Sequence, residues 1–115
     1  MKTGHIYVLS LEDGCYYIGF SQDIQTRICS HFIGCGSKWT ILHKPIDIIA
    51  IKEGCTLLET LITLIYMIKY GFEKVRGGGY TNCDMQEPAA LKKARHYAAY
   101  YKWYTHTQIS QNITK

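Results

Sequence analysis

The sequence lacks an apolar run long enough to span a bilayer and lacks a secretory leader, and both absences argue against a membrane or secreted protein. The longest nearly apolar stretch, residues 57–68, is interrupted by Glu59 and two threonines. The first five residues do not lead into the apolar core of a signal peptide. We therefore expect a soluble intracellular protein, cytoplasmic or nuclear, with host or viral origin left open.

Paired cysteines are also missing. The chain has 5 cysteines, an odd number without any C-x-x-C spacing, which argues against both a disulfide framework and a zinc site. Reduced thiols are expected instead. With 115 residues, 47% hydrophobic and 19% charged, the chain is predicted to form one packed domain rather than a disordered segment.

Positive charge is concentrated in the second half of the chain. Residues 1–60 hold five Lys or Arg against six Asp or Glu, whereas residues 61–115 hold eight against three. A basic half that is also rich in aromatic residues suits a phosphate-backbone partner such as nucleic acid. An ordinary solvated surface has the same composition, so charge alone leaves both interpretations open.

The N-terminal part of the chain predicts a hairpin followed by a helix. Residues 5–9 and 15–20 are rich in β-branched and aromatic residues, and a turn signal at 12–14 separates them. Ser21 is expected to cap the helix that follows. The residues expected to face the core from this helix are Ile24, Ile28 and Phe32.

Three further elements follow. Residues 46–51 are apolar nearly throughout and predict a central strand, and residues 56–70 predict a helix buried over most of its circumference. Residues 75–80 are too glycine-rich for regular structure, and a last helix is expected over 88–104. The order predicts a small α/β domain whose short mixed sheet, of about three strands, is flanked by helices.

Two residue pairs could carry chemistry. Tyr7 and Tyr17 lie on the two strands of the hairpin, where cross-strand side chains approach each other. Arg27 and His31 are four apart and share a helix face; arginine binds phosphate with two donors, and histidine exchanges protons near neutral pH. A chance tyrosine pair and a solvated helix face remain the ordinary alternatives.

Glu59 is the most informative single residue, because a carboxylate in an otherwise apolar helix is costly unless something holds it. It begins a polar stripe that continues through Thr63, Tyr66 and Tyr70. Such a carboxylate can ligate a hard divalent cation. The alternative is a capping box, in which Glu59 bonds back to the backbone N–H of Thr56.

The last helix is basic on one side. Leu91, Ala94, Ala98 and Tyr101 form its expected core stripe. The opposite side either contacts DNA or is simply solvated. The residues that we assign to DNA binding, with one added from the preceding glycine-rich loop, are Lys92, Lys93, Arg95, Lys102 and Arg76.

These motifs together resemble the GIY-YIG endonuclease superfamily. His5-Ile6-Tyr7 and, one hairpin later, Tyr17-Ile18-Gly19 are similar to its signature, with His5 standing where the family has glycine. The resemblance covers about residues 4–82. By this resemblance the catalytic residues are Tyr7, Tyr17, Arg27, His31, Glu59 and Asn82.

A finer resemblance is to the structure-selective branch that cleaves Holliday junctions and flaps. Residues 17–21, Trp39-Thr40 and Lys44-Pro45 are similar to that branch, and residues 75–78 resemble a loop of stand-alone and viral versions. We expect residues 1–84 to be the nuclease core and residues 85–115 to be a C-terminal helix and tail of the same domain.

The resemblance implies a metal-dependent DNA endonuclease that hydrolyses phosphodiester bonds, with flaps or junctions as preferred substrates. It implies one Mg²⁺ or Mn²⁺ held by Glu59, charge neutralisation by Arg27, and Tyr7, Tyr17 or His31 as the base. DNA is the expected partner, with a second copy of the chain or a regulatory protein in addition. The alternatives are a catalytically silent nucleic-acid-binding module and a protein–protein adaptor of the same fold.

Overall fold

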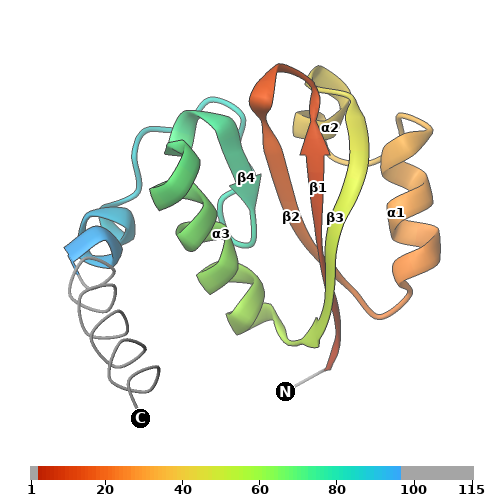
Figure 1. The fold of residues 1–115 in the computed structure, drawn as a ribbon, viewed down its shortest axis with the longest axis horizontal. Coiled ribbons are helices and arrows are strands. Elements are labelled where there is room, and N and C mark those ends of the chain that lie inside the picture. Colours follow the sequence, from red (N-terminus) through yellow and green to blue (C-terminus); the bar gives the residue numbers. More distant parts are fainter. Residues whose placement is uncertain (1–2, 97–115) are drawn as a thin grey trace, which may run out of the picture.

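The computed structural model describes residues 3–96, whose strands form one mixed sheet in the order β3-β1-β2-β4 (Figure 1). β1 (Gly4–Leu11) and β2 (Tyr16–Ser21) make the predicted antiparallel hairpin. β3 (Pro45–Gly54) pairs antiparallel with the other side of β1, and β4 (Val75–Gly77) pairs parallel with β2. The short β4 adds a fourth strand where we expected irregular structure.

Helices cover both faces of this sheet, which confirms the small α/β fold. They are α1 (Ile24–Phe32), α2 (Lys38–Leu42) and α3 (Thr56–Tyr70), with helical backbone again over 89–96. In Figure 1, α1 and α3 stand on opposite sides of the sheet. The five-residue α2 was not predicted from the sequence.

Alternation along β1 divides the core into two clusters. Ile6 and Val8 pack with Ile18 and with Leu64 and Met67 of α3. The intervening side chains point to the opposite face, where the second cluster lies, because successive side chains of a strand face opposite ways. That second cluster consists of Tyr7, Leu9, Leu11, Cys15, Tyr17, Ile28 and Trp39.

The prediction that residues 46–51 form a central strand is wrong, because β3 lies at the sheet edge. Its isoleucines are open to solvent: Ile46 is 62% exposed, Ile49 44% and Ile51 54%. The apolar composition suggested burial on both faces. In the fold, however, α1 contacts mainly β1 and β2, and α3 contacts β2 and β4, so the helices leave β3 uncovered.

Two expectations for the first helix are also wrong. Asp23, not Ser21, is the N-cap of α1, and its carboxylate accepts a hydrogen bond from the Thr26 N–H. The Ser21 hydroxyl instead accepts a hydrogen bond from the N–H of Asp23, just before the helix begins. Phe32, expected in the core, is the last residue of α1 and is 44% exposed.

α3 has the predicted bounds and ends before Gly71, but it is not buried on most sides. Leu57, Leu61 and Ile65 form an exposed apolar stripe. Its N-cap is Cys55, without a side-chain cap bond, so the proposed Thr56–Glu59 capping box does not form. The Glu59 carboxylate is therefore available for another role.

The last helix begins directly after Pro88, as expected, and Leu91 is fully buried in the cluster beneath α3. The expectations for Ala98, Tyr101, Lys102 and Tyr104 lie outside the described residues. None of the helices within residues 3–96 combines the length and apolar character that a bilayer crossing needs.

Candidate active site

Tyr7, Tyr17 and His31 meet on the α1 side of the sheet. The Tyr7 side chain, fully buried on β1, has its hydroxyl 2.7 Å from Nε2 of His31 on α1. The Tyr17 ring centroid lies 4.8 Å from that of His31 and 6.3 Å from that of Tyr7. The structure thus brings together three of the residues that the sequence identified separately.

Two glycines leave room for this contact. A Cβ on Gly19, which lies opposite Tyr7 in the hairpin, would stand 2.2 Å from the Tyr7 hydroxyl oxygen. A Cβ on Gly36 would stand 2.1 Å from Nδ1 of His31. Neither position has a strained backbone, so close approach alone explains the need for glycine.

The Thr40 hydroxyl on α2 contacts the second ring nitrogen of His31. Its hydroxyl lies 2.9 Å from His31 Nδ1, donates to the Ser37 carbonyl at 3.1 Å and accepts from the Ser37 N–H at 3.1 Å. Assigning the hydroxyl proton to the Ser37 carbonyl makes the threonine oxygen the acceptor of the Nδ1–H bond. Nε2 is then unprotonated and accepts the Tyr7 O–H.

Sequence analysis missed Thr40 as a site residue. The available signal was local, because Ser37 and Thr40 make a reciprocal capping interaction at the start of α2. That pattern identifies a helix start. It does not reveal that the same hydroxyl reaches a histidine on another helix, which only the tertiary fold determines.

Burial keeps this constellation neutral. Burial, assisted by the nearby Arg27 charge, lowers the pKa of His31 from 6.5 to about 4. Burial also raises the pKa of Tyr7, with a contribution from Tyr17, and Arg27 opposes the rise. The pKa of Tyr17 is raised by burial and is likewise opposed by Arg27. At pH 7 the imidazole and both phenols are uncharged.

The His31 imidazole should therefore titrate near pH 4 in the folded protein, as measured by ¹⁵N NMR of the ring nitrogens. Since the folded pKa lies below the unfolded one, stability is full above pH 6.5 and falls as pH drops towards 4. The loss is about 3 kcal/mol for a shift of this size. Urea unfolding at pH 7 and pH 4.5 measures it, and His31→Gln should remove most of this pH dependence. A ring that titrates near 6.5 would contradict the buried neutral state.

Arg27 and Glu59 are oppositely charged, and both act electrostatically on the two buried phenols. Half-buried Arg27, on the α1 turn before His31, lowers the pKa values of both Tyr7 and Tyr17, whereas Glu59 raises them. Both charges therefore act on the same two phenols. Arg27 extends one guanidinium nitrogen to 3.5 Å from the Ser30 hydroxyl, and no carboxylate among residues 3–96 pairs with it.

Glu59 faces an open hollow between the start of α3 and the glycine-rich loop. Burial raises the pKa of this half-buried carboxyl, and a hydrogen bond from the Gly78 N–H opposes the rise. Gly78 approaches closely, since its Cβ would lie 2.9 Å from Thr60 Cα, and its φ is +55°. The residues lining the hollow are Thr56, Leu57, Glu59, Thr60, Gly78 and Gly79.

The donor chemistry of this hollow is that of a single carboxylate ligand to a hard divalent ion. Mg²⁺ in nucleic-acid enzymes is commonly bound through one or two carboxylates plus substrate phosphate oxygens. Glu59 offers one such carboxylate at an open surface. Within residues 3–96 no group of three or more His, Cys, Asp or Glu side chains is placed to hold a metal ion, and Glu59 is the one carboxylate among the residues lining this hollow.

The expectation that Arg76 contacts DNA is contradicted. The Arg76 side chain is 3% exposed and donates to the carbonyls of Phe72, Val75, Asn82 and Cys83. Its guanidinium also lies 4.5 Å from the Trp39 ring centroid. Arg76 therefore organises the loop after β4 instead of presenting charge to a ligand.

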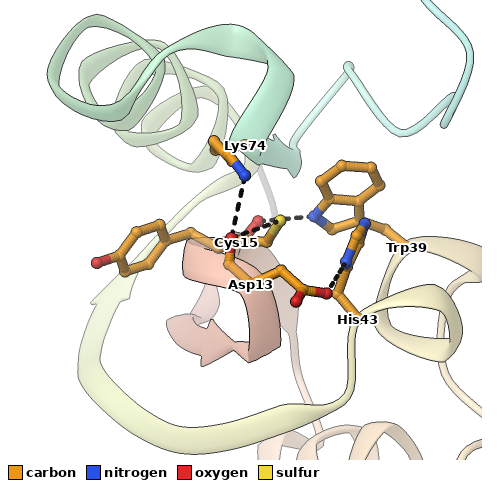
Figure 2. Close-up of polar contacts among 6 residues, drawn as sticks. Asp13, Cys15, Trp39, His43 and Lys74 are labelled. Carbon is orange, nitrogen blue, oxygen red and sulfur yellow. Dashed lines mark hydrogen bonds and ion pairs between the residues drawn. The ribbon is translucent and has the colours of Figure 1, made fainter.

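Trp39 belongs to a polar cluster that anchors α2 to neighbouring segments (Figure 2). Its indole N–H donates to the Tyr16 carbonyl at 3.0 Å, and its ring packs edge-on against His43. His43 in turn contacts the Asp13 carboxylate at 3.2 Å, and Lys74 donates to the Asp13 carbonyl at 3.1 Å. These contacts join α2 to the hairpin turn and to the segment before β4.

Asn82 is not joined to the other predicted catalytic residues by its hydrogen bonds. Its side-chain oxygen accepts from the Asp84 N–H at 3.0 Å, and its carbonyl accepts from Arg76. Among the basic residues of the last helix, Lys92 and Lys93 are exposed, whereas Arg95 forms an ion pair with Glu87. Lys102 lies outside the described residues.

The fold and this site define a small α/β domain with a buried tyrosine–histidine pair, and comparison with known proteins identifies its family. The model of the GIY-YIG catalytic domain matches residues 3–71. The chain belongs to the GIY-YIG family. This confirms the resemblance of the two tripeptide motifs.

Its curated relatives are small proteins named UPF0213. The one from Halobacterium salinarum is 39% identical over 44 residues, covering 38% of this chain and 57% of that protein. The one from Staphylococcus saprophyticus is 35% identical, covering 53% of this chain and 74% of that protein. One from Streptococcus pneumoniae is 36% identical, covering 50% and 64%. No solved structure matches. The match spans little more than half of the first relative, and the names state no activity.

Proposed function

We propose that this chain is a divalent-metal-dependent endonuclease that hydrolyses phosphodiester bonds in DNA. The observation that carries the proposal is the buried Tyr7–His31 hydrogen bond beside one cationic and one anionic side chain, Arg27 and Glu59, in a GIY-YIG catalytic domain. A proton acceptor, a phosphate ligand and a metal ligand are the groups that phosphodiester hydrolysis requires.

Tyr7 and His31 together accept the proton of the attacking water. The water proton passes to the Tyr7 oxygen as the Tyr7 proton passes to His31 Nε2, along the 2.7 Å bond. The nucleophile gains an electron pair without an isolated phenolate being formed. The resulting imidazolium is disfavoured by burial. The negative charge of the bound phosphodiester offsets that cost, so the pair functions only with substrate present.

Arg27 and Glu59 have complementary roles at the phosphate. The Arg27 guanidinium binds nonbridging oxygens in a fork and stabilises their charge as the bond to water forms. Glu59 holds Mg²⁺ or Mn²⁺ at the hollow beside Gly78. When bound, the ion supplies Lewis-acid stabilisation of the phosphate and the leaving oxygen.

The direct test incubates the protein with supercoiled plasmid, plain duplex, flaps and four-way junctions, each with Mg²⁺, Mn²⁺ or EDTA. We expect metal-dependent cleavage, with flaps or junctions cut faster than plain duplex. DNA binding without cleavage under every condition would favour the silent binding module. Neither binding nor cleavage would favour the adaptor.

Thr40→Val should lower the cleavage rate by about 10- to 100-fold, because valine matches the shape of threonine but cannot accept the Nδ1–H bond that fixes the histidine tautomer. Thr40→Ser retains the hydroxyl and should restore most activity. The measurement is the single-turnover rate against pH. A purely structural Thr40 would make both variants lose activity in proportion to stability, without any change in the pH profile.

Lys92 and Lys93 are expected to hold the DNA backbone, since both are exposed on the helix that docks through Leu91. Replacing both by glutamine should lower the slope of log affinity against log salt by up to about 2, at roughly 0.9 per phosphate contact on duplex DNA. Binding titrations at several salt concentrations measure the slope. Lys44→Gln, beside β3 at the opposite sheet edge, is the control, and an equal change of slope per lysine removed would reduce the role of this helix to general charge.

A further inference from the structure

β3 presents an uncovered apolar edge. Among the described strands it pairs only with β1, and its other edge leaves backbone N–H and C=O groups without a neighbouring strand. Ile46, Ile48, Ile49 and Ile51 are all more than a third exposed. Such an edge is a template for pairing with a further strand.

The pairing of β3 with β1 defines which of its side chains share a face. Residues opposite each other in a ladder lie on the same face. Ile51 and Ile48 lie opposite Tyr7 and Leu9, hence on the α1 side. Ile48 and Ile51 are three residues apart and would face opposite ways in a regular strand. A β-bulge between them places both side chains on the same face.

Two charged residues of β3 lie on the opposite face, by the same pairing with β1. Lys52 lies opposite Ile6 and Asp47 opposite Ser10, which places both on the α3 side of the sheet. Neither forms an ion pair among residues 3–96. Asp47 accepts a bond from the Ile48 N–H through Oδ1, which leaves Oδ2 for another partner.

This arrangement is self-complementary. In a two-fold antiparallel pairing of β3 with itself, centred between Ile49 and Ala50, Asp47 stands opposite Lys52 of the second copy. Ile48 then stands opposite Ile51 of the second copy, and each pair shares a face. Both pairs occur twice by symmetry. Shifting the register by one residue places Asp47 opposite Ile51 or Glu53, on the wrong face, and removes the charge match.

We propose that the β3 edge is a homodimer interface, through which two copies join their sheets into one continuous sheet. The occupant is a second copy because the charges of β3 complement β3 itself in one register. The chain's own C-terminal segment begins elsewhere. The helix at 89–96 packs through Leu91 with α3 and β4, on the far side of the sheet from β3 (Figure 1).

The test is a charge exchange read out by sedimentation velocity over a range of protein concentrations. Asp47→Lys and Lys52→Asp should each weaken dimerisation by at least about tenfold, since two symmetric pairs become repulsive. The double variant restores opposite charges across the interface and should recover most of the affinity. Within one strand the two side chains are about 16 Å apart, beyond the screening length of about 8 Å. Recovery therefore cannot arise within one chain.

Controls separate association from folding and from activity. Glu73→Lys reverses an exposed charge outside β3 and should leave the dimer unchanged. Ile48→Thr/Ile51→Thr keeps strand propensity and should give a folded monomer by circular dichroism. A wild-type protein that remains monomeric at all concentrations would overturn the proposal. A dimer whose affinity does not change in the charge-exchange variants would also overturn it, because the dimer interface would then lie outside β3. Neither result depends on cleavage.

Discussion

Glu59→Gln is expected to abolish metal-dependent cleavage, with a rate loss of about 10³-fold or more, while folding and DNA binding persist. Glutamine has nearly the same shape but lacks the charge that a hard divalent ion requires. The hollow beside Gly78 places this carboxylate at an accessible surface. The measurement is single-turnover cleavage across Mg²⁺ and Mn²⁺ concentrations, with DNA affinity measured in EDTA.

The structure supplies a matched control in Glu73→Gln, an exposed carboxylate in the turn after α3. That variant should cleave at the normal rate. Because Glu59 does not cap its helix, Glu59→Gln should also change the unfolding free energy little. Cleavage by Glu59→Gln at the wild-type rate would eliminate the metal-ligand assignment.

Tyr7→Phe is expected to lower the cleavage rate by about 10²- to 10⁴-fold, the range for loss of a general base. The change removes the hydroxyl that joins water to His31 Nε2. It also leaves a buried acceptor without its donor, which should cost about 1–3 kcal/mol of stability. Cleavage rates should be compared well below the midpoint of thermal unfolding, where both proteins are folded.

Tyr66→Phe is the matched control for this change. Tyr66 lies in a separate aromatic group with Tyr16 and Tyr70 on the α3 side, with ring centroids 5.6 and 5.8 Å away. It should retain normal activity. If Tyr7→Phe cleaved as well as Tyr66→Phe does, water activation by the tyrosine–histidine pair would be wrong, and the base would have to be sought elsewhere.

The sequence indicated the positions of Tyr7, Tyr17 and His31 more accurately than it indicated the edges of the fold. Tyr7 and Tyr17 were placed by the hairpin, whose register follows from alternation and a short turn. His31 followed from helical spacing. These are short-range relationships, and the tertiary structure keeps them. Their hydrogen bonds and pKa values could not be predicted, because they depend on Thr40, which reaches His31 from a helix that the sequence pattern did not indicate.

β3 and Arg76 show what local patterns cannot determine. An all-apolar strand predicts burial, yet β3 is an edge strand, because strand order is determined by the chain's return path and not by composition. Arg76 looks like a surface cation in a glycine-rich loop. It is buried because the fold surrounds it with carbonyls of nearby residues, up to Cys83, and with the ring of Trp39, which is distant in sequence.

The short helix α2 ties the two halves of the site to one folding unit. The adjacent residues Trp39 and Thr40 have different partners. Thr40 contacts His31. Trp39 packs on Arg76, which donates hydrogen bonds to the loop that follows Gly78. A helix of five residues has little stability of its own. Local opening of α2 would therefore release the imidazole and the loop in one event. Amide protons of α2 and of residues 82–84 should exchange with deuterium at the same rate and respond together to mild denaturant.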